Sequence, residues 1–141
     1  MVETRDNEYK AYFTVVGDFD PADLTVQIGL HPTSSWKKGD RNEKTHLERK
    51  FSRWNLDSRL DQFASLEAQI ADVLKQLKPK VDEIHRIGKV YGGGGMQLVG
   101  WFYQDFPGLH FEKELLADLA HFELSLDCDF YYMYSDKRED S

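Results

Sequence analysis

An amphipathic segment in the middle of the chain most constrains what this sequence can fold into. Five apolar residues recur at spacings of three and four, the pattern of a helix with one buried face: Phe63, Leu66, Ile70, Val73 and Leu77. Ser58 can cap the start of this helix, and Pro79 breaks or kinks it before further turns around Val81 and Ile84. Such a helix must pack its apolar face against other elements of the chain.

Four extended segments can form the sheet that this helix covers. They are rich in aromatic and β-branched residues, and the last alternates most regularly: 8–16, 45–56, 96–106 and 124–132. The second segment alternates irregularly, because Leu47 and Phe51 share one parity while Trp54 and Leu56 share the other, so we expect a bulge or twist within it.

Two shorter helices complete the predicted order of elements. Asp20 and Pro21 open one that Gly29 ends, and the other runs from about Glu112 to His121. The order predicts an α+β fold: a four-stranded mixed or antiparallel sheet with helices mainly on one face, and two strand-helix-strand halves around the long central helix. We expect a single domain over residues 1–134 and a disordered tail of acidic and basic residues at 135–141.

Charge is distributed unevenly along the chain. The formal net charge is -7, yet the segment from Trp36 to Arg59 holds eight basic and four acidic residues, a local +4 that leaves -11 for the rest. Nonspecific binding of nucleic acid requires clustered cations, so nucleic acid is not the expected partner of the whole surface. The cytoplasm is the expected compartment and no membrane contact is expected, because the start lacks signal-peptide character and no run of about 18 apolar residues exists.

Several familiar chemistries do not fit the order of residues. The glycine run within Gly88–Gly95 is followed by a strand rather than by Lys-Ser/Thr at a helix start, so it is not a phosphate loop. Asp18–Asp23 lacks the glycine and glutamate positions of a calcium loop. The five histidines lack the paired spacing of a zinc site, and we expect no metal and no cofactor. Cys128 cannot form an internal disulfide, and its place in the closing strand predicts an inert buried thiol.

One face of the sheet is expected to stay open, because the helices pack mainly on the other. Aromatic and acidic residues predicted for that face, with Phe102 as an alternative to Trp101, suggest a partner surface: Tyr12, Trp101, Tyr103, Asp127, Asp129 and Tyr131. Asp127 and Asp129 share one face of a strand, so they are also candidates for acid-base catalysis. A solvated strand face is the plainer interpretation of this pair.

A second candidate site lies in the basic segment. Basic residues are interleaved with tryptophans there and could hold an anion or stack on a base: Trp36, Lys37, Lys38, Arg49, Arg53 and Trp54. In the alternative, Trp36 packs over the end of the first helix while the two lysines extend into solvent. We favour this structural interpretation for the loop GLHPTSSWKKGD at 29–40.

Four motifs occur together and in order: GLHPTSSWKKGD from Gly29, RWNLDS from Arg53, LKPK from Leu77 and ELSLDCDFYY from Glu123. In this combination the sequence resembles the family catalogued as domain of unknown function 4279, from the first strand to Tyr132. The resemblance implies a compact, mainly bacterial α+β protein. It supplies no established reaction and therefore implies no catalytic residues; the Trp and Gly positions resemble structural signatures.

These features predict a non-catalytic, cytoplasmic protein-binding domain, whose specific form is an immunity-type protein that neutralises a basic toxin. The expected partner is an unidentified protein with a basic surface, and a homodimer is the alternative. A second hypothesis is a binder of a small anion or nucleic-acid end through the basic segment. The third is an enzyme of unknown reaction that uses Asp127 and Asp129.

Overall fold

A computed structural model of the chain describes residues 5–91 and 94–134. In chain order the elements are β1 (Glu8–Gly17), α1 (Pro21–Ile28), β2 (Ser34–Trp36), β3 (Ser52–Asp57), α2 (Leu66–Leu77), the 3-10 helix η1 (Lys78–Lys80), α3 (Val81–Tyr91), β4 (Gly95–Phe102), α4 (Lys113–His121) and β5 (Ser125–Tyr132). The tail predicted at 135–141 lies outside the described residues. Within the described ranges, no helix combines the length and the apolar character that a membrane span requires.

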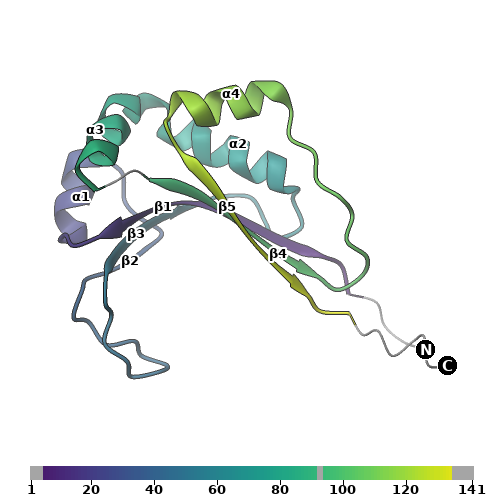
Figure 1. Cartoon of the computed structure of the whole chain (residues 1–141), viewed down its shortest axis with the longest axis horizontal. Helices are drawn as coiled ribbons and strands as arrows, with labels where there is room; N and C mark the ends of the chain where they lie inside the picture. The colour runs from purple at the N-terminus through teal and green to yellow at the C-terminus, as the bar shows by residue number, and fades with distance from the viewer. Residues whose placement is uncertain (1–4, 92–93, 135–141) are drawn as a thin grey trace.

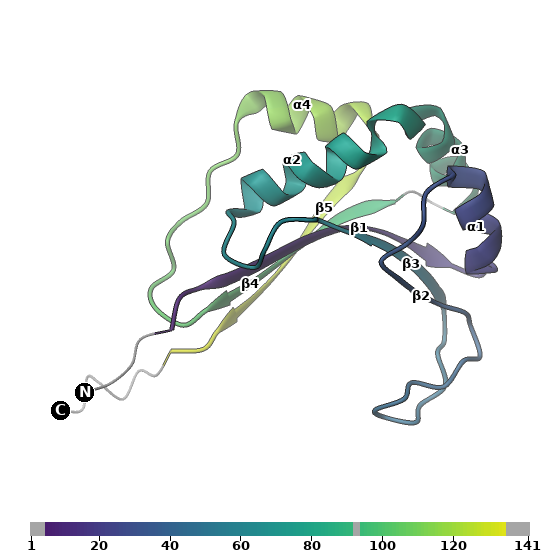
Figure 2. The ribbon, with the colours of Figure 1, turned by 180° about the vertical axis from the view of Figure 1, so that it is seen from behind.

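The strands form one mixed sheet with the order β2-β3-β1-β4-β5. The pairs β2-β3, β3-β1 and β1-β4 are antiparallel, whereas β4 and β5 are parallel because α4 carries the chain back between them. Figures 1 and 2 show the helices gathered on one face of this sheet, while the described chain leaves the other face without a helix. The α+β class and the mixed sheet are confirmed, but the sheet has five strands rather than four.

The strand missing from the prediction is β2, which lies inside the loop at 29–40. Its first two residues are serines and Pro32 precedes it, so local sequence does not favour a strand there. β2 forms because its backbone pairs with β3, where Trp36 lies opposite Arg53. The extended stretch predicted at 45–56 is shortened accordingly: the regular strand starts at Ser52, and residues 37–51 form a hairpin that projects away from the helices (Figure 1).

β1 lies at the centre of the sheet, and its alternation separates the two faces. Ala11, Phe13 and Val15 are fully buried on the helix side. Val15 is paired with Trp54 of β3, and the Phe13 and Trp54 rings meet edge to face with centroids 6.1 Å apart. The core therefore lies between the sheet and its layer of helices.

The first helix begins and ends where the sequence predicts. The Asp20 side chain accepts a hydrogen bond from the Ala22 amide at 3.0 Å, and Pro21 occupies the first helical position. Gly29 ends α1 with a φ of 79°, a left-handed conformation that a residue with a Cβ rarely adopts.

The cap of the long helix α2 lies seven residues later than predicted. Ser65 caps it by accepting a hydrogen bond from the Ala68 amide at 3.1 Å, whereas Ser58 accepts one from Leu60 in the preceding turn. Phe63 lies before the helix and is 55% exposed. The other four residues of the periodic stripe are buried in α2, and Pro79 lies in η1, where the path bends into α3.

Cys128 is exposed, so its predicted burial is wrong. β5 is an edge strand with a strand neighbour on one side, and only Leu126 and Phe130 among its residues pack against the core. Partial burial of the thiol raises its pKa, and the neighbouring Asp127 and Asp129 carboxylates raise it further. A raised pKa leaves little thiolate at neutral pH, so a low reactivity is still expected.

Candidate functional site

The open face of the sheet, opposite the helices, carries both candidate surfaces. Alternation and register place five of the predicted partner residues on this face, and we call them the partner face: Tyr12, Trp101, Asp127, Asp129 and Tyr131. Tyr103 directly follows β4, and the Arg5 guanidinium lies 4.2 Å from its ring centroid. The sheet thus brings together residues that are more than a hundred positions apart in sequence.

Neighbouring side chains hold the aromatic rings of the partner face in place. Trp101 and Tyr131 stack with centroids 6.4 Å apart and an interplanar angle of 20°, because the parallel register of β4 and β5 places them side by side. The Lys10 ammonium lies 5.2 Å from the centroid of the Tyr12 ring. Tyr131 is nevertheless 50% exposed. Large aromatic side chains that are already ordered provide contact area at a low entropic cost.

Asp127 and Asp129 lie beside these rings on β5, and both are exposed. The Gln97 side chain donates a hydrogen bond to the Asp129 carboxylate at 3.0 Å. No cluster of three or more His, Cys, Asp or Glu side chains in the described ranges could hold a metal ion. Exposed carboxylates on an edge strand are accessible to a cationic partner surface.

A row of polar side chains crosses the middle of the open face. Thr14 donates a hydrogen bond to Asn55 at 2.7 Å, and Asn55 donates one to Ser34 at 3.1 Å, so the row links β1, β3 and β2. Next to it, Lys10 pairs with Asp57 at 3.3 Å. These groups satisfy one another, so the chemistry available to a ligand lies toward the two ends of the face.

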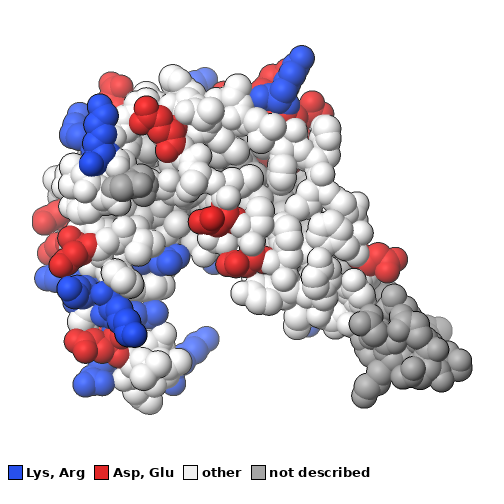
Figure 3. Space-filling view, in the orientation of Figure 1, with Lys and Arg blue, Asp and Glu red and all other residues white. Residues whose placement is uncertain are grey.

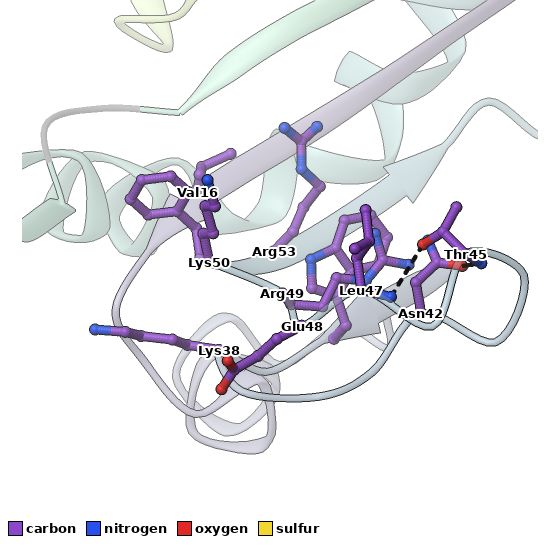
Figure 4. A pocket seen from close by; sticks show the side chains of 11 residues that line it. Val16, Lys38, Asn42, Thr45, Leu47, Glu48, Arg49, Lys50 and Arg53 are labelled. Carbon is purple, nitrogen blue, oxygen red and sulfur yellow. Dashed lines mark hydrogen bonds between the residues drawn. The ribbon is translucent and has the colours of Figure 1, made fainter.

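The β2 end of the open face contains a cleft of about 820 Å³, which we call the basic cleft (Figure 4). It lies between the projecting hairpin and β1, where Val16 forms part of its wall. In the space-filling view, many of the visible Lys and Arg side chains gather on this hairpin, beside a hollow under the sheet (Figure 3).

Trp36 is half-buried in this cleft, and two guanidinium groups lie close to its ring. The Cζ atom of Arg49 lies 3.8 Å from the centroid of the indole ring, and that of Arg53 lies 5.8 Å from it. The hairpin holds Arg49 there through backbone hydrogen bonds from Gly39 to Arg49 at 2.9 Å and from Arg49 to Asp40 at 2.7 Å. Trp36 therefore does not pack over the end of α1, because it lies on the opposite face of the sheet.

Two of the six residues predicted for this site lie elsewhere. Trp54 is fully buried in the core, where its indole nitrogen donates a hydrogen bond to Thr25 at 3.0 Å. Alternation along β3 turns Trp54 toward the helices when Arg53 faces the cleft. Lys37 is exposed but does not line the cleft, whereas Lys38 does and lies 3.5 Å from the Asp18 carboxylate.

The cleft also contains residues that the sequence analysis did not select as site residues. They include Lys50 and two apolar side chains, Leu47 and Phe51, which are 69% and 61% exposed. The irregular alternation of 45–56 was the available signal. Because Leu47 and Phe51 are out of phase with Trp54 and Leu56, they could not all face one core.

Comparison with protein families gives one match. The model of the family described as Domain of unknown function (DUF4279) matches residues 7–133. The chain belongs to the DUF4279 family. No curated protein matches the chain, and no solved structure matches it. In this DUF4279 protein the match extends from just before β1 to just after β5, so both the partner face and the basic cleft lie within the matched residues.

Proposed function

We propose that this DUF4279 protein is a non-catalytic binding domain that holds a partner protein on the open face of its sheet. The observation that carries the proposal is the partner face itself, where stacked Trp101 and Tyr131 lie beside two exposed carboxylates. Tyrosine and tryptophan are enriched where proteins meet. The core is on the other side of the sheet, so these rings do not serve it.

A protein with a basic surface is the partner that fits this face chemically. Outside the segment 36–59 the chain carries a net charge of -11, and Asp127 and Asp129 present two carboxylates at an edge strand. Complementary charge steers a partner toward the face and speeds association. The specific form of the proposal is an immunity-type protein that neutralises a basic toxin in the bacterial cytoplasm, a role that needs no catalysis by this chain.

Capture from a lysate of the native host, treated with nuclease, tests this function. The bait is the tagged wild type or one of two charge-reversed variants with the same change in net charge. One carries Asp127→Lys and Asp129→Lys on the partner face; the control carries Glu114→Lys and Asp118→Lys on the exposed side of α4. We expect the wild type and the control to capture the same protein, and the partner-face variant to capture about tenfold less or none.

Equal capture by all three baits would overturn the proposal, as would recovery of nucleic acid without a protein. Light scattering on the purified protein examines the homodimer as an alternative. A dimeric mass in the wild type that becomes monomeric in the partner-face variant would make a second copy of the chain the partner.

A further inference from the structure

We propose that the basic cleft binds an organic anion, in which a carboxylate or phosphate group is attached to an apolar body. Arg49 and Arg53 would hold the anionic group beside Trp36, and Phe51 with Leu47 would contact the apolar body. This site lies at the other end of the open face from the partner face, so the inference does not rest on the proposed function.

Three of the four cations that line the cleft have no ion-pair partner among the described residues. Lys38, Arg49, Lys50 and Arg53 line it together with one carboxylate, that of Glu48. Throughout residues 5–91 and 94–134, no acidic side chain lies within ion-pair distance of Arg49, Lys50 or Arg53. Like charges held close together repel one another, and an anion bound between them would relieve that repulsion.

The two arginines are positioned for such a group. Both guanidinium carbons lie within 5.8 Å of the same ring centroid. Stacking on Trp36 orders the Arg49 side chain without using its N–H donors, and among the described residues Arg53 donates a single long hydrogen bond, 3.5 Å to the Thr14 hydroxyl. A planar guanidinium with free donors binds a carboxylate or phosphate through paired hydrogen bonds.

The apolar side chains of the cleft determine the rest of the ligand. Phe51 and Leu47 are more exposed than most large apolar residues, and Val16 adds apolar surface from β1. A bare inorganic ion would leave these groups in water, whereas an apolar body would cover them. The cleft therefore favours an anion with an aromatic or aliphatic body over the anionic group alone.

Glu48 limits where the anionic group can bind. In Figure 4 its carboxylate points toward Lys38, away from the Arg53 guanidinium. Lys38 is also close to Asp18, so its charge is partly compensated. The end of the cleft with Arg49 and Arg53 is therefore its most electropositive part, and the anionic group belongs there.

An NMR titration of the full chain tests the inference, with four small molecules as probes. Phenyl phosphate and phenylpropionate combine the two required features; inorganic phosphate has only the charge, and phenylpropanamide has only the apolar body. The readouts are the indole N–H resonance of Trp36 and the guanidinium N–H resonances of Arg49 and Arg53. We expect both organic anions to shift these resonances saturably and both single-feature probes to bind about tenfold more weakly or not at all.

Two double variants with equal loss of charge assign the binding to this cleft. Arg49→Gln with Arg53→Gln should weaken binding of the organic anions by about tenfold or more. Lys37→Gln with Lys44→Gln removes two exposed lysines of the same hairpin that do not line the cleft, and should leave binding within about twofold. Equal melting temperatures of the two variants would show that both are folded.

Three outcomes would overturn the inference. If inorganic phosphate alone bound as tightly as the organic anions, the ligand would not need an apolar body. If both double variants weakened binding of the organic anions equally, the overall charge of the protein rather than this cleft would explain the binding. Absence of any shift with the organic anions would show that the cleft is not a binding site for this class. A stronger response to phenyl phosphate than to phenylpropionate, or the reverse, identifies which anionic group the site takes.

Discussion

The Gln69 side chain hydrogen-bonds to the backbone of β1 beyond the point where the pairing with β3 ends. β3 pairs with β1 from Tyr12 to Gly17, so the earlier part of β1 needs other hydrogen-bond partners on that side. The Gln69 amide supplies them: its oxygen accepts from the Ala11 amide at 3.0 Å, and its nitrogen donates to the Tyr9 carbonyl at 2.9 Å. One buried side chain on α2 thus ties the helix layer to the central strand of the sheet.

Replacing Gln69 by leucine should therefore destabilise the protein even though the new side chain is apolar. The substitution removes the hydrogen-bond partner of the Ala11 amide and the Gln69 donor of the Tyr9 and Ala64 carbonyls, at an expected cost of about 2–4 kcal/mol. Urea denaturation measures this cost. Gln62→Leu, at an exposed position just before α2, is the control and should change stability by less than about 0.5 kcal/mol. A Gln69→Leu protein as stable as wild type would contradict this account of β1.

The ionisation of Asp72 makes the free energy of unfolding depend on pH. The Arg59 guanidinium donates to its carboxylate at 2.7 Å, and the Arg59 backbone amide donates at 2.8 Å. The hydrogen bond from the Arg59 side chain lowers the pKa of Asp72 below its usual value of 3.8, although burial opposes the shift. A lowered pKa in the folded state adds stability above pH 3.8, and this stability is lost as the pH falls through the folded-state pKa.

Asp72→Asn should consequently be less stable than the wild type at pH 7, and the gap should be smaller at pH 2. Denaturation at both pH values measures the gap between the two proteins. The stabilisation by the ion pair falls as acid protonates the Asp72 carboxylate of the wild type, whereas the asparagine does not titrate. A gap of the same size at pH 2 would show that Asp72 acts through packing instead.

At the scale of elements, the sequence is informative where a segment determines its own structure. The caps of α1 are local, so Asp20 and Gly29 predict its limits correctly. The stripe from Leu66 to Leu77 predicts the buried face of α2, because periodicity reflects burial. The cap of α2 is Ser65 rather than the predicted Ser58, because the chain path from β3 determines where the helix starts.

Elements that depend on distant partners could not be predicted in this way. β2 is held by pairing with β3, and the stacking of Arg49 on Trp36 requires the hairpin to fold back. Alternation predicted the faces of β1 and β5, and with them the partner face. Alternation could not show which of the adjacent residues Arg53 and Trp54 faces the core and which faces the cleft. In an irregular strand, the neighbouring strands determine which side chains point to each face.

The start of α2 provides a prediction at this scale. Ser65→Ala removes the side chain that accepts from the Ala68 amide, and should cost about 1 kcal/mol of stability. Ser58→Ala removes a hydrogen bond in an exposed turn and should cost less than about 0.5 kcal/mol. Thermal denaturation of both variants measures the difference. A larger loss for Ser58→Ala would place the functional cap at the residue that the sequence first indicated.

At the scale of the whole molecule, the helices cover one face of the sheet and leave two chemically different surfaces on the other. The partner face combines aromatic rings with carboxylates on β1, β4 and β5, and the basic cleft lies at the β2 end. The hydrogen-bonded row of Thr14, Asn55 and Ser34 lies between them. Because the two surfaces share no residue, a substitution in one should leave binding at the other unchanged.

Site-specific photo-crosslinking in the native host tests the partner face most directly. A photoreactive phenylalanine analogue replaces Tyr131 on the partner face, Tyr12 on the same face, or Leu116 on the exposed side of α4. We predict that the first two positions crosslink to one and the same protein and that Leu116 does not. Crosslinking from Leu116 alone, or to unrelated proteins from each position, would contradict the claim that the open face of the sheet binds a specific partner.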